Sequence, residues 1–161
     1  MEYFAKSPNA EGHQETVKEH LQAVAALARE YGEPMGLANA AELEGQIHDF
    51  GKYSGAFQDV LRGKRTGVDH AMGGACFLEA CYKGRASSRP LIEAVNGHHD
   101  GLASYDMIRG ELHAIADKSK TPVGNGGKDP AIGTGAELSE ANAAFRQDFP
   151  CFRFPSLPAP P

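Results

Sequence analysis

Apolar residues in the first two-thirds of the chain recur every three or four positions, and this helical period constrains the fold more than any other feature. The clearest stripe covers residues 16–30, where Thr16 and Glu19 have the spacing of a capping box. Gly32 and Pro34 predict the end of this helix. Similar stripes predict helices over about 37–50, 54–61, 70–81, 90–99 and 104–118. No stretch alternates apolar and polar residues as a half-buried strand does, so we predict an all-α fold.

The last quarter of the chain has a different composition. Residues 121–135 are rich in Gly and Pro and lack periodicity, which predicts a mobile loop. A weak helical pattern that reaches Phe145 follows, and the Pro-rich end suits neither a helix interior nor a central strand. We therefore expect a helical core over residues 1–118. Residues 119–161 should form an irregular Gly/Pro-rich segment of flexible loop, weak helix and tail, cut short before a further domain.

Composition excludes several classes of protein. A chain of 161 residues with 41% hydrophobic types can bury one domain core, and it has no run of about 18–20 apolar residues that would span a membrane. The N-terminus lacks the apolar stretch of a secretory signal, and the three cysteines form no C-x-x-C. These features favour a reducing cytoplasmic location. The net charge of −5 argues against a wholly basic nucleic-acid coat.

Five of the seven histidines and one aspartate fall where the predicted helices begin, end or face the interior. These candidate ligands are His20, His48, Asp49, His70, His98 and His99. A single inward histidine is more often a hydrogen-bonded core residue than a metal ligand. Five in one small core would be costly to bury unpaired, and a divalent cation removes that cost. His13 and His113 lie off the apolar stripes and are expected at the surface.

The donor types narrow the choice of metal. Sites rich in imidazole suit first-row transition ions such as Mn, Co, Ni or Fe better than Mg or Ca, which prefer oxygen ligands. Six donors exceed what one ion takes while keeping an open position. Two ions about 3.5–4 Å apart, bridged by Asp49, would use all of them. Such a pair activates water and clamps phosphate oxygens, which predicts metal-assisted hydrolysis of a phosphate ester.

Four sequence motifs carry a family resemblance. They are EHLQAVA, HDFGKYSGAFQ, DHAMGGA and NGHHDGL, in that order between Glu19 and Leu102. IHDFGKYSGAFQ resembles the signature of the HD superfamily of metal-dependent phosphohydrolases. The complete set resembles the HD nuclease domain of the CRISPR-associated helicase–nuclease of type I systems. The N-terminal YFAKSPN and the Pro-rich end are similar to the subtype I-C branch.

The resemblance implies an HD-domain helical bundle whose metal ligands are the same six residues. It places Asp49 and Lys52 among the catalytic residues, since the Lys52 ammonium can stabilise developing phosphoryl charge; the alternative is a solvated loop lysine. The family also has a late-helix aspartate ligand. Within these residues Asp117 is the nearest candidate and Asp148 a weaker one, but a position beyond Pro161 is favoured over both.

The resemblance further implies a nuclease that cuts single-stranded DNA in antiviral defence. Arg62, Lys64 and Arg65 precede His70 and could hold a nucleic-acid backbone, or they form a polar surface turn. The implied partners are an RNA-guided CRISPR surveillance complex and a helicase, on the same chain or as a separate subunit. No Walker motif occurs in these 161 residues. The alternatives are an HD phosphohydrolase of small nucleotides and a non-catalytic, metal-stabilised docking module.

Overall fold

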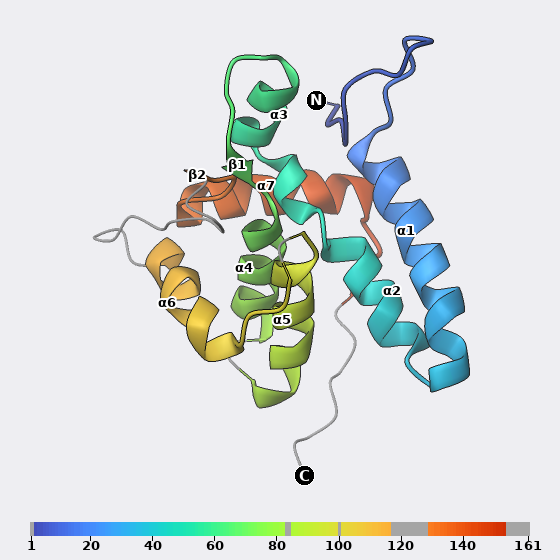
Figure 1. The fold of residues 1–161 in the computed structure, drawn as a ribbon, viewed down its shortest axis with the longest axis vertical. Coiled ribbons are helices and arrows are strands. Elements are labelled where there is room, and N and C mark those ends of the chain that lie inside the picture. The colour runs from blue at the N-terminus through green and yellow to red at the C-terminus, as the bar shows by residue number, and fades with distance from the viewer. Residues whose placement is uncertain (1, 83–84, 100, 117–128, 154–161) are drawn as a thin grey trace.

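The structure is a computed structural model that describes residues 2–82, 85–99, 101–116 and 129–153. Helices account for nearly all regular structure in these ranges, so the predicted all-α class is confirmed (Figure 1). The α-helices are α1 (Val17–Gly32), α2 (Ala38–Ile47), α3 (Gly55–Leu61), α4 (Ala71–Tyr82), α5 (Arg89–Gly97), α6 (Tyr105–Ala116) and α7 (Gly135–Asp148). Three short 3-10 turns are η1 (Glu33–Met35), η2 (Phe50–Tyr53) and η3 (Ala86–Ser88). Within the described ranges, no helix has the length and apolarity needed to cross a membrane.

Helix α1 begins as the sequence predicts. The Thr16 hydroxyl accepts a hydrogen bond from the Glu19 backbone N–H at 3.2 Å, and the Glu19 carboxylate accepts one from the Thr16 N–H at 2.9 Å. These reciprocal bonds form a capping box. Helix α1 packs closely on α2, because Gly45 has no side chain: a Cβ there would lie 2.6 Å from the Ala25 Cα. This hairpin brings the first turn of α1 beside the end of α2.

Helix α2 ends at Ile47, earlier than the predicted limit at Phe50. Asp49 leaves the helical conformation, with φ −104° and ψ 20°, and the chain continues as the η2 turn. The apolar period did not reveal this break because Phe50 is also buried, with its ring stacked on Phe77 at a centroid separation of 4.3 Å. The break turns the Asp49 side chain toward the histidines of other elements.

Helix α4 is the central helix of the core and lies directly against η2. Two successive glycines permit this approach: a Cβ on Gly73 would lie 2.7 Å from the Gly51 Cα, and one on Gly74 would lie 2.5 Å from the Ile47 carbonyl oxygen. Gly51 is equally constrained, since its Cβ would lie 2.2 Å from the His70 carbonyl oxygen. The packing therefore sets the backbone of residues 47–51 against the start of α4.

The expected core limit at residue 118 is wrong, because later residues belong to the same core. Ile132 and Phe145 are fully buried, and Phe145 packs edge-on against Phe77. Strand β2 (Asp129–Pro130) pairs in parallel with β1 (Val68–Asp69), which no alternating pattern predicted. Ile132 stands alone among Gly and Pro, and a two-residue strand has no detectable period, so the sequence carried little signal here. Residues 119–128 and the tail over 154–161 lie outside the described ranges.

We expect Gly74→Ala to lower the free energy of unfolding by about 1–3 kcal/mol, because the added methyl group overpacks the contact with Ile47. Gly110→Ala is the matched control: Gly110 lies in α6 with nothing within 4 Å of its Cβ position. That variant should gain about 0.5–1 kcal/mol from helix propensity. Urea denaturation followed by circular dichroism measures both values. A stabilising Gly74→Ala would contradict the close packing of α4 on α2.

Candidate metal centre

The Asp49 carboxylate lies at the centre of the candidate site and is only 3% exposed. Its two oxygens face different histidines. Oδ2 lies 2.8 Å from His20 Nε2 and 3.1 Å from His48 Nε2. Oδ1 lies 3.0 Å from His70 Nε2 and 3.4 Å from His98 Nε2. One buried carboxylate is thus shared by imidazoles from four parts of the chain.

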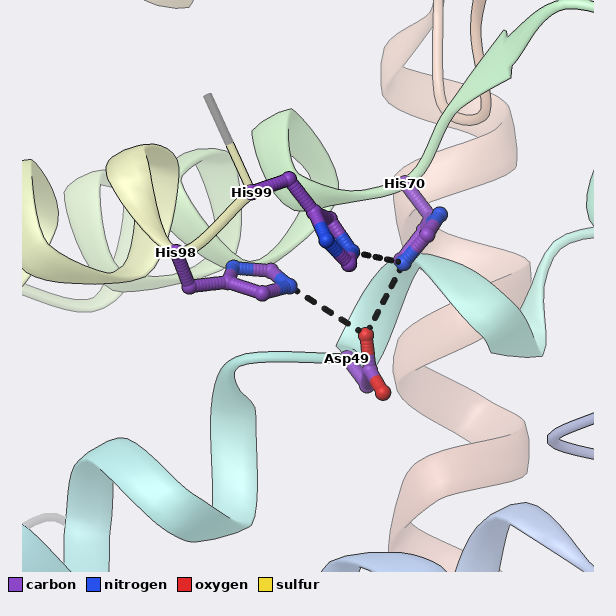
Figure 2. Close-up of side chains that lie close together, drawn as sticks. All are labelled: Asp49, His70, His98 and His99. Carbon is purple, nitrogen blue, oxygen red and sulfur yellow. Dashed lines mark hydrogen bonds and ion pairs between the residues drawn. The ribbon is translucent and has the colours of Figure 1, made fainter. Parts of the chain in front are cut away.

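His99 belongs with the histidines that face Asp49 Oδ1, since its Nε2 lies 2.8 Å from His70 Nε2. In Figure 2 the rings of His70, His98 and His99 converge on Asp49 from the end of α5 and the start of α4. We call Asp49, His70, His98 and His99 the Oδ1 half-site, and His20, His48 and Asp49 the Oδ2 half-site. In each half-site one ligand atom from every residue lies within 4.8 Å of the others, which is suitable for a metal ion.

Backbone carbonyls orient two of the imidazoles. His48 Nδ1 bonds to the Gly45 carbonyl oxygen at 3.0 Å, and His98 Nδ1 bonds to the Val95 carbonyl oxygen at 2.6 Å. Both carbonyls belong to the last turn of the preceding helix. Because a carbonyl can only accept, each Nδ1 carries a proton, and in the neutral ring the Nε2 lone pair then faces Asp49. This is the usual orientation of a metal-binding histidine.

Glu15 lies beside His20 on the side away from Asp49, and the sequence analysis did not identify it. The Glu15 Oε2 lies 3.5 Å from His20 Nδ1 and 3.0 Å from Lys6 Nζ. A carboxylate at the far nitrogen of a histidine fixes the ring and makes the other nitrogen a better ligand. Glu15 reaches this position because the N-terminal arm folds back on itself, with the Ala5 N–H bonded to the Glu15 carbonyl at 2.9 Å. No motif or periodicity in the sequence encodes that contact.

The donor set fits a divalent cation. Two of its buried polar atoms, Asp49 Oδ1 and His98 Nε2, have no hydrogen-bond partner in the described part of the chain. Burial alone would raise the pKa of the Asp49 carboxyl, but the surrounding histidines outweigh it and hold that pKa well below its ordinary value. The carboxylate is therefore charged, and its histidines can balance that charge in two ways: as protonated rings that donate to it, or as neutral rings whose Nε2 lone pairs bind a cation beside it. In the second arrangement the cation is a metal ion, and these residues would hold it.

Lys52 lies at this centre and not in solvent. Its Nζ is 2.7 Å from Asp49 Oδ2, and its side chain is 12% exposed. The ammonium also lies over the Phe57 ring, 5.5 Å from the centroid. The structure thus places Lys52 beside the shared carboxylate, where a bound anion would meet it.

Gln58, the last residue of the HDFGKYSGAFQ motif, holds the Lys52 backbone in place. Its side chain is 2% exposed, and its Nε2 donates to the carbonyl oxygens of Lys52 and Phe4, both at 2.9 Å. Its Oε1 accepts from the Phe4 N–H at 3.1 Å. Gln58 therefore joins η2 to the N-terminal arm, next to the Oδ2 half-site.

The candidate nucleic-acid residues do not join the centre. Arg62 pairs with Asp59 at 3.2 Å, and Arg65 pairs with Asp129 at 2.8 Å. Lys64 is exposed on the same loop. Arg62 lines a hollow to which none of the six candidate ligands contributes. Two of the three charges are thus already paired with carboxylates, and a role in binding nucleic acid stays a prediction.

The two internal candidates for the late-helix aspartate have different outcomes. Asp148 accepts a hydrogen bond from the Tyr53 hydroxyl at 2.7 Å and belongs to neither half-site. Its position at the end of α7 gives it a structural partner in η2. Asp117 lies outside the described ranges. His13 and His113 are exposed, as expected from their positions off the apolar stripes.

Glu44 is a second unpaired carboxyl group, one helical turn before His48. Its Oε1 is buried without a hydrogen-bond partner among the described residues. Burial raises the pKa of Glu44 from its usual 4.5 to about 8. The sequence analysis did not single it out, because a glutamate near the middle of an amphipathic helix is ordinarily solvated.

A comparison with protein-family models gives no match for this chain, and a comparison with curated protein sequences gives none either. The geometry of the site is therefore the main guide to its chemistry. That geometry is a buried His/Asp group with ligand atoms at metal-binding distances.

We expect Mn²⁺ or Ni²⁺ to raise the melting temperature of the wild-type protein. A free ion at 100 times its dissociation constant stabilises the folded state by about 2.7 kcal/mol. Asp49→Ala removes the ligand common to both half-sites, so its melting temperature should not respond to the ion. The control Asp106→Ala alters an aspartate on α6 whose side chain is 78% exposed, and it should respond like wild type. An equal shift in Asp49→Ala would place the binding elsewhere.

Glu44→Gln should stabilise the protein in a pH-dependent way. Below pH 4.5 the Glu44 carboxyl is neutral in both states, so the variant and wild type should have similar stability. Between pH 4.5 and about 8 the unfolded chain ionises first, and wild type loses stability that the variant retains. Urea midpoints at pH 4.5, 6 and 8 measure the difference, which should grow with pH. A constant difference would contradict the burial of this carboxyl.

Proposed function

We propose that this chain is a metal-dependent phosphohydrolase of the HD type. More narrowly, we propose that it is the single-stranded DNA nuclease domain of a CRISPR interference system. The observation that carries the proposal is the arrangement around Asp49. One buried carboxylate separates two groups of imidazoles, and an ammonium stands beside it. The narrower proposal of a CRISPR nuclease rests on the order of the sequence motifs and on the family resemblance that they carry.

The proposed cofactor is a pair of divalent transition ions, Mn, Co, Ni or Fe in preference to Mg, with Asp49 shared between them. When bound, such ions lower the pKa of water and neutralise charge on phosphate oxygens. The Oδ1 half-site would hold one ion and the Oδ2 half-site the other.

The chain's own residues have distinct parts in this mechanism. Asp49 provides the negative charge that both half-sites need, and its burial excludes water from that charge. Lys52 is placed to donate to a phosphoryl oxygen as negative charge develops on it. Glu15 keeps the His20 ring turned toward Asp49 and acts as a positioning residue.

Exposure at one edge of the Oδ1 half-site supports a polymeric substrate, although the His70 and His98 side chains are only 15% and 18% exposed. His99 is exposed at its rim, and Leu102, three residues further on, is 80% exposed. An open rim admits the sugar–phosphate backbone of a strand without enclosing a base. We propose single-stranded DNA as the substrate, delivered by a helicase and by the RNA-guided complex that opens the target duplex.

One observation favours the alternative of a small nucleotide substrate. The pairing of Arg62 with Asp59 and of Arg65 with Asp129, together with a net charge of −5, leaves less positive charge to bind a polyanion. An HD phosphohydrolase that acts on a nucleotide needs no such surface. Hydrolysis of free nucleotides without cleavage of long strands would support this alternative.

Incubation with circular single-stranded DNA tests the proposal. We expect nicking with Mn²⁺, Co²⁺ or Ni²⁺, less with Mg²⁺, and a loss of at least about 10³-fold in Asp49→Ala, because both half-sites lose their common ligand. Asp106→Ala should cut like wild type, because the Asp106 side chain is 78% exposed on α6 and belongs to neither half-site. Equal nicking by Asp49→Ala would indicate a contaminant. Metal-dependent stabilisation without hydrolysis of any DNA or nucleotide would indicate a docking module.

A further inference from the structure

The two oxygens of Asp49 have unequal surroundings. Oδ2 is the one that meets Lys52, whose Nζ lies 2.7 Å away, in addition to the imidazoles of the Oδ2 half-site. The closest contacts of His70 and His98 with Asp49 are instead to Oδ1, at 3.0 and 3.4 Å. The protein's own cation, the Lys52 ammonium, thus lies nearer to the Oδ2 half-site than to the Oδ1 half-site.

Lys52 is held firmly in this position. Its side chain is 88% shielded from solvent, and its ammonium also lies over the Phe57 ring. The Lys52 carbonyl is bonded to the buried Gln58 side chain. A shielded ammonium–carboxylate contact is stronger than an exposed one, because water and salt screen it less. A metal ion that takes Asp49 Oδ2 as a ligand must therefore compete with a resident positive charge.

The Oδ1 half-site differs from the Oδ2 half-site in its ligands and in its unpaired buried atoms. It offers three imidazoles and a carboxylate oxygen, whereas the Oδ2 half-site offers two imidazoles and an oxygen already engaged by Lys52. Two Oδ1 half-site atoms, Asp49 Oδ1 and His98 Nε2, are buried without a hydrogen-bond partner in the described ranges. Binding a cation there satisfies both atoms and displaces no charged group.

We propose that the two half-sites bind metal ions in a fixed order, the Oδ1 half-site first. Lys52 sets this order by lowering the cation affinity of the Oδ2 half-site. This inference rests on the proposed metal centre, and it assigns Lys52 a second role as an internal competitor for Asp49 Oδ2. At limiting metal concentration the protein then holds one ion, in the half-site formed by α5 and the start of α4.

Titration with Mn²⁺, followed by electron paramagnetic resonance, tests the order. We expect two binding steps in the wild-type protein, with the spectrum of a coupled Mn²⁺ pair emerging only in the second. His99→Ala should weaken the first step, and His20→Ala should weaken only the second. Steps of equal affinity, or a first step that weakens in His20→Ala and not in His99→Ala, would overturn the proposed order.

The role of Lys52 is tested in the same titration. Lys52→Met keeps the aliphatic stem over Phe57 and should tighten the second step about tenfold, or about 1.4 kcal/mol. Lys52→Arg retains the charge and should leave the second step weak, while Lys64→Met controls for loss of a surface charge. Lys52→Gln gives a second neutral variant should Lys52→Met prove unstable. An unchanged second step in a folded neutral variant would overturn the competition.

Failure of this inference is distinguishable from failure of the proposed function. Two Mn²⁺ binding steps whose affinities do not change in the Lys52 variants would rule out competition by Lys52. The proposal of a metal-dependent enzyme would still stand. Absence of any Mn²⁺ binding by the wild-type protein would overturn both. Ordered binding without DNA or nucleotide hydrolysis would support the inference while contradicting the proposed activity.

Discussion

The burial of the Asp49 carboxylate is the constraint on which the rest of the site depends. A lone carboxylate at 3% exposure would be strongly destabilising, and the chain surrounds it with donors from α1, α2, η2, α4 and α5. Each donor comes from a helix end or a first turn, where side chains can project inward without breaking a helix. The buried charge of Asp49 is thus stabilised only where these elements meet, and the packing of the apolar core sets the distances between them.

Backbone packing at three glycines makes this meeting possible. Gly51 rests on the His70 backbone, Gly73 rests on Gly51, and Gly74 rests on the Ile47 carbonyl. These contacts set the backbone around Asp49 close to the start of α4, where His70 Nε2 lies 3.0 Å from Asp49 Oδ1. The parallel pairing of β1 with β2 holds the other side of His70, because the Ala131 N–H donates to the Asp69 carbonyl. The residues that pack these elements together are therefore direct neighbours of the residues that form the candidate metal centre.

The fold class and the six candidate ligands could both be predicted from the sequence, because both depend on local signals. Helical periods and the Thr16–Glu19 capping box are local signals, and histidines at helix ends stand out against apolar stripes. What the sequence misses depends on contacts between distant segments. Ile132, for example, enters the core from a Gly/Pro-rich stretch. Glu15 is near His20 in the sequence, but it precedes α1, so the helical period does not show where its side chain lies. The limit of α2 at Ile47 was hidden because Phe50 continues the apolar pattern.

Asp49 as a carboxylate shared between two cations is the central claim, and anomalous diffraction from crystals soaked in Mn²⁺ tests it most directly. We predict two anomalous peaks, one on each side of the Asp49 carboxylate, each about 2 Å from the Nε2 atoms of its own half-site. At low Mn²⁺ concentration the peak beside His70, His98 and His99 should dominate. Data of good quality with no peak within coordination distance of Asp49, or with peaks only at surface carboxylates, would contradict the account.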